Sequence, residues 1–271
     1  MTYEKWYKLY HPHKRYFFFD IDGTLTDNAT KKVVPSALKA LKKLQAAGHF
    51  VAIATGRAHY KASMMMEELG LHNMVCSGGK CLVMNDEIVE NIPLDRDKVL
   101  AIIAQATSLG YGILAMIDDS IDVYAKDDLF CQQVGPRKEP TNYIIDPNID
   151  FTQIPHFYKL YVAISSDQEN RLTLKESLGH LRFVKDYLMF QHDAKDEGIC
   201  LFMDKLQQDH KDVVVFGDDH NDLVMFKPRW TSIAMGNACS ELKAKATYVT
   251  AKNVDDGIYQ ACEKFGWFKQ I

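Results

Sequence analysis

Three short apolar segments of the chain each end abruptly in a polar motif. Tyr16–Phe19 is followed at once by DIDGT, Phe50–Ala54 by TGR, and residues 213–216 by GDDHND. Runs of four or five apolar residues are typical of parallel strands that are buried on both faces. Because ligands bind outside the carboxyl ends of such strands, the pattern predicts an α/β fold with its reactive groups at one sheet edge.

Helical patterns separate these strands. Pro35 is suited to the first turn of a helix, apolar residues recur after it at helical spacing, and Gly48 closes the pattern. This alternation predicts a Rossmann-like, doubly wound parallel-sheet core. The other elements expected in this part are strands at 233–235 and 248–250 and helices at 198–207 and 258–265.

The middle of the chain has a different pattern, in which hairpins replace the alternation. We therefore expect an inserted α+β domain over residues 82–187, with the α/β core formed by residues 1–81 and 188–271. Residues 126–156 carry four prolines and no steady period, so no element is assigned there. The expected elements are hairpins at 81–84/88–92 and 111–117/121–125, helices at 95–109 and 168–178, and strands at 157–164, 183–184 and 188–190.

Composition excludes several classes of protein. The 271 residues are 47% apolar and 25% charged, with a formal net charge of −4. These values are ordinary for a globular enzyme, and the excess of acidic residues argues against binding nucleic acid by phosphate neutralisation. No stretch approaches the ~20 apolar residues of a membrane span, and no signal peptide is recognised at the N-terminus. We expect a cytoplasmic protein, a monomer or small homo-oligomer, with no membrane or nucleic-acid partner.

The cysteines and the N-terminal segment carry weaker signals. The six cysteines are scattered without C-x-x-C spacing, so we expect reduced thiols rather than a metal or disulfide role. Residues 1–15 mix aromatic and basic side chains and suggest a surface arm. A metal clip formed by His11 and His13 is the alternative for that arm.

The acidic motifs demand a positive partner. Asp20, Asp22 and Asp218 follow strands whose ends should lie side by side, and carboxylates crowded in this way repel one another unless a cation joins them. Lys195 precedes the helix that leads to the third strand. An all-oxygen ligand set favours Mg²⁺.

Taken together, the motifs resemble the haloacid dehalogenase superfamily, in particular its Cof-type phosphatases with a type-IIB cap. The resemblance covers nearly all of the chain after residue 15. It is carried by DIDGTLTD at 20–27, ATGR at 54–57, DAKDEGI at 193–199, GDDHND at 217–222, and a tail AMGNA…LK…ATYVT…DGI between residues 234 and 258.

The resemblance implies a role for each acidic residue. Asp20 resembles the nucleophile that forms an aspartyl-phosphate, and Asp22 the general acid and base. The implied Mg²⁺ ligands are the side chains of Asp20 and Asp218 and the backbone carbonyl of Asp22. Asp222 is implied to order metal-bound water and to orient Lys195.

The resemblance also implies a phosphate-binding group. Thr55 and the Gly56 amide match the pair that holds the phosphoryl oxygens. Lys195 would hold the nucleophile and stabilise the transition state, and Asn221 would support both the phosphate and the metal.

The expected activity is Mg²⁺-dependent hydrolysis of small phosphorylated metabolites. Family resemblance suggests sugar phosphates, pyridoxal phosphate, flavin mononucleotide or nucleotides as substrates, without choosing among them. An aspartate at position 22 matches phosphatases and phosphomutases, whereas transport ATPases carry threonine there. A phosphomutase and a catalytically idle, ligand-sensing relative are the alternatives.

Several further residues have more than one interpretation. Arg57 either reaches the substrate or fixes the start of a helix, and His220 is expected to face solvent rather than bind metal. Departures from the family pattern occur at Asp196, Asp219 and the Ser77-Gly78-Gly79 hinge. The candidates for substrate contact on the inserted domain are Asp118, Asp119 and Tyr124; as turn and strand-face residues they also have a purely structural interpretation.

Overall fold

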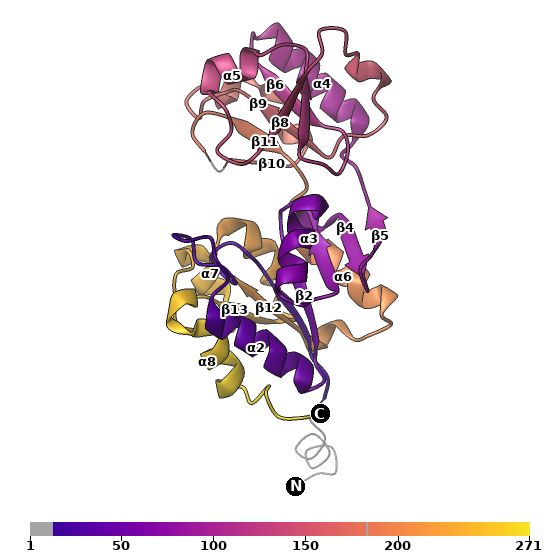
Figure 1. Cartoon of the computed structure of the whole chain (residues 1–271). Coiled ribbons are helices and arrows are strands. Elements are labelled where there is room, and N and C mark those ends of the chain that lie inside the picture. Colours follow the sequence, from indigo (N-terminus) through magenta and orange to yellow (C-terminus); the bar gives the residue numbers. More distant parts are fainter. Residues whose placement is uncertain (1–12, 183) are drawn as a thin grey trace. The chain divides into compact units, whose positions relative to one another are not determined.

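A computed structural model describes residues 13–182 and 184–271 (Figure 1). Most of the predicted N-terminal arm, including His11, lies outside these residues. So does residue 183, the first of the strand predicted at 183–184, and Val184 lies in a bend. The chain forms two compact units. Of the described residues, the first unit comprises 13–56, 62–89 and 194–271, and the second 57–61, 90–182 and 184–193.

The first unit is built on an eight-stranded sheet with the order β14-β13-β12-β1-β2-β3-β4-β5. The six strands from β14 to β3 run parallel, and β4 is antiparallel to β3. This arrangement confirms the expected doubly wound α/β core. The strands are β1 (Tyr16–Phe19), β2 (Phe50–Ala54), β3 (Asn73–Cys76), β4 (Cys81–Met84), β5 (Glu87–Asn91), β12 (Val213–Gly217), β13 (Thr231–Ala234) and β14 (Tyr248–Val249).

Alternate residues of β1 pack on opposite faces of this sheet. Phe17 and Phe19 join the cluster formed with α2 (Pro35–Ala46), α3 (His59–Glu68) and α8 (Gly257–Lys264). Tyr16 and Phe18 join the cluster on the other face, formed with α6 (Lys195–Lys205) and α7 (Ser240–Lys245). All four aromatic side chains of β1 are at most 4% exposed. The central strand is thus fixed from both sides, by about 2–3 kcal/mol for each fully buried ring.

The order of the strands places a switch point beside β1. The chain leaves β1 for β2 on one side, whereas β12 lies on the other side with Phe19 opposite Phe216. Adjacent crossovers that depart in opposite directions leave a crevice at the carboxyl ends of the strands. The residues that follow β1 and β12 are therefore brought together at this edge.

The second unit contains a six-stranded sheet with the order β10-β11-β9-β6-β7-β8. Helix α4 (Arg96–Ser108) packs on one face of it, and α5 (Leu129–Val134) on the other. Asp95 caps α4 by accepting a hydrogen bond from the Lys98 amide, as its position predicts. The strands are β6 (Ile113–Met116), β7 (Asp122–Ala125), β8 (Asn142–Ile145), β9 (Lys159–Val162), β10 (His180–Leu181) and β11 (Leu188–Phe190).

Two expectations need correction. The first hairpin, expected at the start of the inserted domain, extends the sheet of the first unit instead, because β4 pairs with β3; Asn85 and Asp86 form its turn with positive φ angles. The helix expected at 168–178 is two 3-10 turns, Glu169–Arg171 and Thr173–Ser177. Leu172, with ψ 79°, interrupts the helix and is buried in the α4 cluster.

Within the described ranges, 13–182 and 184–271, no helix combines the length and the apolar character needed to cross a bilayer.

Candidate active site

Asp20 lies directly beyond the central strand. Its backbone amide donates to the carbonyl of Phe216 (3.0 Å), which continues the pairing of β1 with β12. The carboxylate is 5% exposed. Burial, reinforced by the nearby carboxylate of Asp222, raises the pKa of Asp20 well above its usual value, although Lys195 acts in the opposite direction.

Lys195 supplies the ammonium group of the site from the first turn of α6. Its Nζ donates to Oδ1 of Asp20 and to Oδ1 of Asp222, both at 2.7 Å, and the side chain is 1% exposed. Burial alone would lower the pKa of this ammonium, but the two carboxylates outweigh burial and raise it. Lys195 is therefore held as a permanent cation.

Close backbone contact brings the start of α6 to this position. The amide of Ala194 donates to the carbonyl of Gly78 (2.8 Å). A Cβ on Gly79 would lie 1.9 Å from the carbonyl oxygen of Ala194, and Gly79 has a φ of +100°. Only glycine fits there, which gives the Ser77-Gly78-Gly79 departure a structural role.

Asp222 braces the loop that follows β12. Its Oδ1 accepts from Lys195, and its Oδ2 accepts from the backbone amides of Asp218 (2.9 Å) and Asp219 (3.2 Å). The side chain is fully buried. Both oxygens are thus engaged by the protein, so Asp222 is suited to positioning Lys195 and the loop.

Asp218 faces Asp20 from the adjacent strand end. Thr24 donates to its Oδ1 (2.8 Å), and Asn237 lies 3.4 Å from its Oδ2. A Cβ on Gly23 would lie 2.1 Å from Oδ2, so the DGT motif needs glycine to admit this carboxylate. Burial, then repulsion from Asp222, raises the pKa of Asp218 to about 7.

The donor set at this edge suits a hard divalent cation. One carboxylate oxygen from each of Asp20, Asp218 and Asp222 lies within 4.8 Å of the others, and all three residues are buried. Burial, and then the repulsion among three carboxylates that face a single ammonium, raises the pKa values of Asp20 and Asp218. An ion of charge +2 would relieve this repulsion, and oxygen ligands are those that Mg²⁺ prefers. Asp222 is fully buried and accepts hydrogen bonds from Lys195 and from two backbone amides, whereas Asp20 and Asp218 retain some exposure, so Asp20 and Asp218 are the better ligands of the three.

The remaining predicted residues lie on the same strand ends. Asp22 is exposed, two residues after the buried Asp20, and pairs through its backbone with Thr26. Thr55 follows β2; it is buried, and its amide donates to Val75 (2.8 Å). Gly56 and Asn221 are half-buried beside Thr55 and Asp222 in sequence. Their catalytic and phosphate-binding roles stay predictions.

The candidate substrate contacts of the second unit have local partners. Asp119 accepts from Nδ1 of His59 (2.6 Å) and from the amide of Tyr60 (2.9 Å), so it caps the first turn of α3. Asp118 accepts from Ser120 (2.6 Å). Tyr124 is half-buried on β7. The cap interaction gives Asp119 a structural function, in line with the structural interpretation of this residue.

Two supporting asparagines were not predicted. Asn237 donates to the carbonyl of Gly23 (2.8 Å) and accepts from the amide of Asn253 (3.0 Å). Asn253 donates in turn to the carbonyl of Thr26 (2.8 Å). These bonds tie the DIDGTLTD loop to the C-terminal segment. The Gly-Asn-Ala part of the tail motif was the signal for Asn237, whereas Asn253 has no comparable signal.

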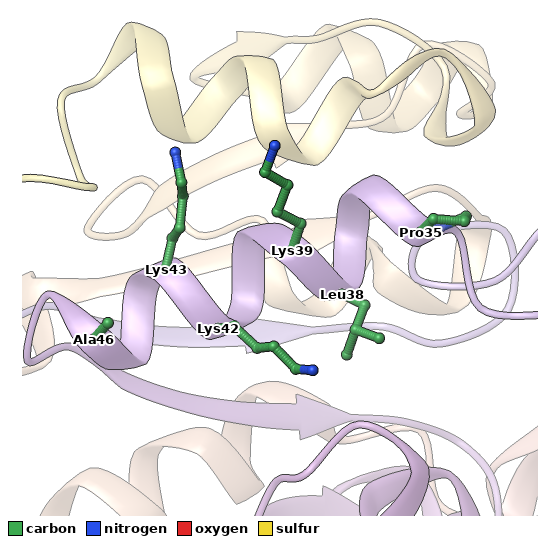
Figure 2. Close-up of a pocket in the computed structure, with 6 residues that line it drawn as sticks. All are labelled: Pro35, Leu38, Lys39, Lys42, Lys43 and Ala46. Atoms are coloured by element: carbon green, nitrogen blue, oxygen red, sulfur yellow. The ribbon is translucent and has the colours of Figure 1, made fainter.

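A groove of about 350 Å³ lies along α2, apart from these residues. Figure 2 shows Lys39 and Lys43 directed toward α8, and Leu38 and Lys42 directed away from it. Lys43 donates to the Tyr259 hydroxyl (2.6 Å). None of the predicted site residues lines the groove, which is formed by Pro35, Leu38, Lys39, Lys42, Lys43 and Ala46.

The chain is similar to known proteins over nearly its whole length. The model of the haloacid dehalogenase-like hydrolase family matches residues 17–262. A candidate phosphatase of Bacillus subtilis (strain 168), YkrA, is 30% identical over 257 residues, covering 93% of this chain and 98% of the relative. The pyridoxal phosphate phosphatase YbhA of Escherichia coli (strain K12) is 26% identical, with coverages of 91% and 96%. The crystal structure of a hypothetical protein from Geobacillus kaustophilus superposes with a TM-score of 0.79 at 26% identity, over 94% of this chain and all of the other.

Proposed function

The chain belongs to the haloacid dehalogenase-like hydrolases, and we propose that it is a Mg²⁺-dependent phosphatase that hydrolyses small phosphorylated metabolites through an aspartyl-phosphate. One observation carries the proposal. The buried carboxylate of Asp20 lies against the ammonium of Lys195, within an acidic cluster at the switch point of the sheet. A buried nucleophile held by a permanent cation is suited to attack on a phosphate dianion.

The acidic cluster would hold the metal. Asp20 and Asp218 are the proposed side-chain ligands, together with the backbone carbonyl of Asp22. The ion would neutralise phosphate charge, which allows an anionic nucleophile to approach. Thr24, Asn237 and Gly23 keep Asp218 in place for this function.

We propose two chemical steps. A carboxylate oxygen of Asp20 forms a bond to phosphorus while the bond from phosphorus to the ester oxygen breaks, and Asp22 gives its proton to the leaving alcohol. Asp22 then accepts a proton from water, whose oxygen attacks the phosphorus; phosphate leaves and the Asp20 carboxylate is restored. The exposed position of Asp22 next to the buried Asp20 supports this division of roles.

The phosphoryl group would be held by the ends of the neighbouring strands. Thr55 and the amide of Gly56 follow β2, Lys195 begins α6, and Asn221 precedes Asp222. Donors aimed at the equatorial oxygens stabilise the charge that develops during transfer. The roles of Thr55, Gly56 and Asn221 are part of the proposal.

Compact phosphomonoesters are the proposed substrate class. The Escherichia coli relative named a pyridoxal phosphate phosphatase supports this size of substrate, and the net charge of −4 gives no support to a nucleic-acid partner. Pyridoxal phosphate, sugar phosphates, flavin mononucleotide and nucleotides are the compounds to test. Six scattered cysteines without C-x-x-C spacing support the cytoplasmic location that we include in the proposal.

The test is hydrolysis of p-nitrophenyl phosphate and a panel of phosphate esters by the whole chain. We expect EDTA to abolish turnover and Mg²⁺ to restore it. Asp20→Asn should lower kcat by at least about 10³-fold because it removes the nucleophile, with an unchanged circular dichroism spectrum. The matched control is Asp27→Asn, a half-buried position in the same loop whose carboxylate accepts from Ala29 and Thr30, which should retain activity. Full activity in Asp20→Asn would reject the mechanism, and isomerised ester formed faster than free phosphate would indicate a mutase.

A further inference from the structure

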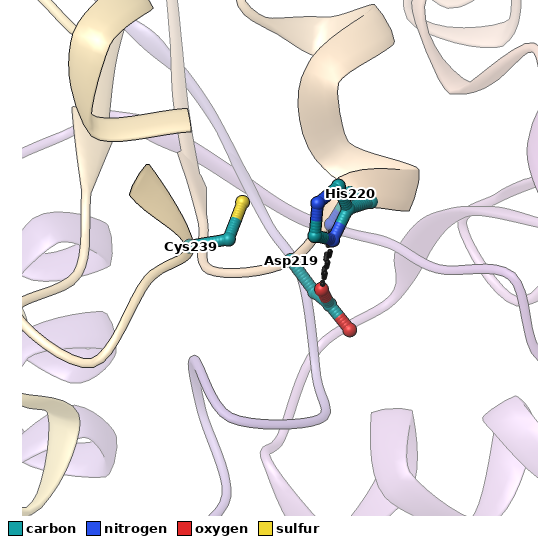
Figure 3. Close-up of side chains that lie close together, drawn as sticks. All are labelled: Asp219, His220 and Cys239. Atoms are coloured by element: carbon teal, nitrogen blue, oxygen red, sulfur yellow. Dashed lines mark hydrogen bonds and ion pairs between the residues drawn. The ribbon is translucent and has the colours of Figure 1, made fainter. Parts of the chain in front are cut away.

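A second group of metal-ligating side chains lies beside the acidic cluster. Asp219, His220 and Cys239 each place one ligand atom within 4.8 Å of the others. Figure 3 shows that they come from two segments of the chain, with Cys239 on one segment and the neighbouring residues Asp219 and His220 on the other. We propose that these three residues bind a zinc-type divalent ion, at a site distinct from the one formed by Asp20, Asp218 and Asp222.

Main-chain hydrogen bonds fix the two pieces relative to each other. The amide of Cys239 donates to the carbonyl of Asp218 (2.9 Å). The amide of His220 donates to Oδ1 of Asp219 (2.7 Å), and the same oxygen lies 2.9 Å from Nδ1 of the His220 ring. The ligands thus start from an ordered framework, which lowers the entropic cost of gathering them around an ion.

The distances need only a small adjustment. With bonds of about 2.0–2.3 Å at tetrahedral angles, ligand atoms around one zinc ion lie roughly 3.3–3.8 Å apart. Atoms that already lie within 4.8 Å must therefore approach by at most about 1.5 Å. Side-chain rotation can bring the ligand atoms this much closer, since the His220 and Asp219 side chains are 63% and 59% exposed.

A water molecule would supply the fourth ligand. Oε2 of Glu241 lies 3.7 Å from Nε2 of His220, whereas Asp219 lies against Nδ1 of the same ring. Glu241 therefore suits the role of a partner that orients the imidazole, and water would complete a tetrahedral shell, as in zinc sites with three protein ligands.

The donor types separate this site from the acidic cluster. Thiolate and imidazole are ligands that zinc accepts and that Mg²⁺ does not favour, whereas the acidic cluster offers oxygen alone. On binding, the Cys239 thiol releases its proton to solvent as the bond from sulfur to zinc forms, and His220 binds as the neutral imidazole. The two sites should therefore be occupied by different ions when both are present.

The test is a titration of the full chain in saturating Mg²⁺, which blocks the acidic cluster. Co²⁺, a spectroscopic substitute for zinc, should produce a near-ultraviolet thiolate-to-metal charge-transfer band that saturates at one equivalent. Zn²⁺ should remove this band, and competition with a chromophoric chelator gives its affinity. We expect Cys239→Ser to abolish the band and to weaken Zn²⁺ binding at least tenfold, and His220→Asn to weaken binding similarly.

Two control variants match the ligand variants. Cys131→Ser removes a half-buried thiol outside the cluster, and His72→Asn removes an exposed histidine paired with Asp86 (2.7 Å). Both controls should bind Co²⁺ and Zn²⁺ as the unaltered chain does. The proposal is overturned if the unaltered chain shows no charge-transfer band, if Mg²⁺ displaces all of the bound Zn²⁺, or if Cys239→Ser binds Zn²⁺ with unchanged affinity.

Discussion

Replacing Lys195 by methionine tests whether one ammonium holds the acidic cluster together. Lys195→Met keeps most of the side-chain volume and removes the ammonium group. The buried carboxylates of Asp20 and Asp222 each accept a hydrogen bond from this ammonium at 2.7 Å. Breaking a buried ion pair from one side costs about 3–5 kcal/mol, because the remaining charge stays buried without compensation. We expect a loss of this size in the free energy of unfolding at pH 8 in EDTA.

Lys80→Met is the matched control. Lys80 also pairs with a carboxylate at short distance, Oε2 of Glu197 on α6 (2.6 Å), but the two side chains are 25% and 64% exposed. Exposed ion pairs contribute about 0–1 kcal/mol, since solvent screens them. The two variants thus remove the same group from pairs that differ in burial.

Urea unfolding followed by tryptophan fluorescence measures both losses. Trp230 and Trp267 pack in the two clusters of the first unit, so their emission reports the unit that contains the site. The deficit of Lys195→Met should shrink as the pH falls. Without the ammonium, the raised pKa of Asp20 rises further, so the folded variant takes up a proton that relieves the repulsion. A loss below about 1 kcal/mol at pH 8, equal to that of Lys80→Met, would refute the reasoning.

Three further predictions concern metals. Gly23→Ala should raise the Mg²⁺ concentration needed for half-maximal hydrolysis at least tenfold, because the new Cβ would lie 2.1 Å from Oδ2 of Asp218. The control Gly70→Ala, also at positive φ but in open space, should leave this concentration unchanged. Equal Mg²⁺ dependence of the two variants would contradict the prediction. The pKa of Asp218 in the folded protein, about 7, lies above its usual value, so the metal-free protein loses stability as the pH rises toward 7. Below that pH, Mg²⁺ must displace the proton of the Asp218 carboxyl group in order to bind. Scanning calorimetry should therefore show a larger Mg²⁺-induced rise in Tm at pH 8 than at pH 5.5, and equal rises would be inconsistent with this expectation. With Mg²⁺ saturating, Zn²⁺ should slow turnover of the unaltered chain more than that of Cys239→Ser, since the Cys239 amide donates a hydrogen bond to the carbonyl of Asp218 and so links the two metal sites. Identical inhibition curves would argue against a link between the sites.

The core strands could be predicted because their signal is local. Tyr16–Phe19 and Phe50–Ala54 have the bounds expected from their apolar runs, and the motifs that follow them lie at one edge because both strands are parallel. The helix at 168–178 could not be predicted correctly. Its apolar spacing is helical, but burying Leu172 against α4 requires a backbone angle that breaks the helix.

The supporting contacts of the site depend on long-range proximity. Thr24 and Asp218 are 194 positions apart, and Thr26 and Asn253 are 227 apart. No local pattern can pair such residues, so the motifs predicted candidates for the reacting groups but not the groups that hold them. The short strand β3 was missed for a related reason: its four residues gain their partners from β2 and β4 on either side.

The amide of Asp20 bonds to Phe216 beyond a strand that is packed on both faces. In deuterium oxide such an amide exchanges its hydrogen only when the surrounding sheet opens as a whole. The isotope uptake at this one position would therefore report the global opening of the first unit, and slow uptake there would mean that the proposed nucleophile is in place for as long as the unit stays folded.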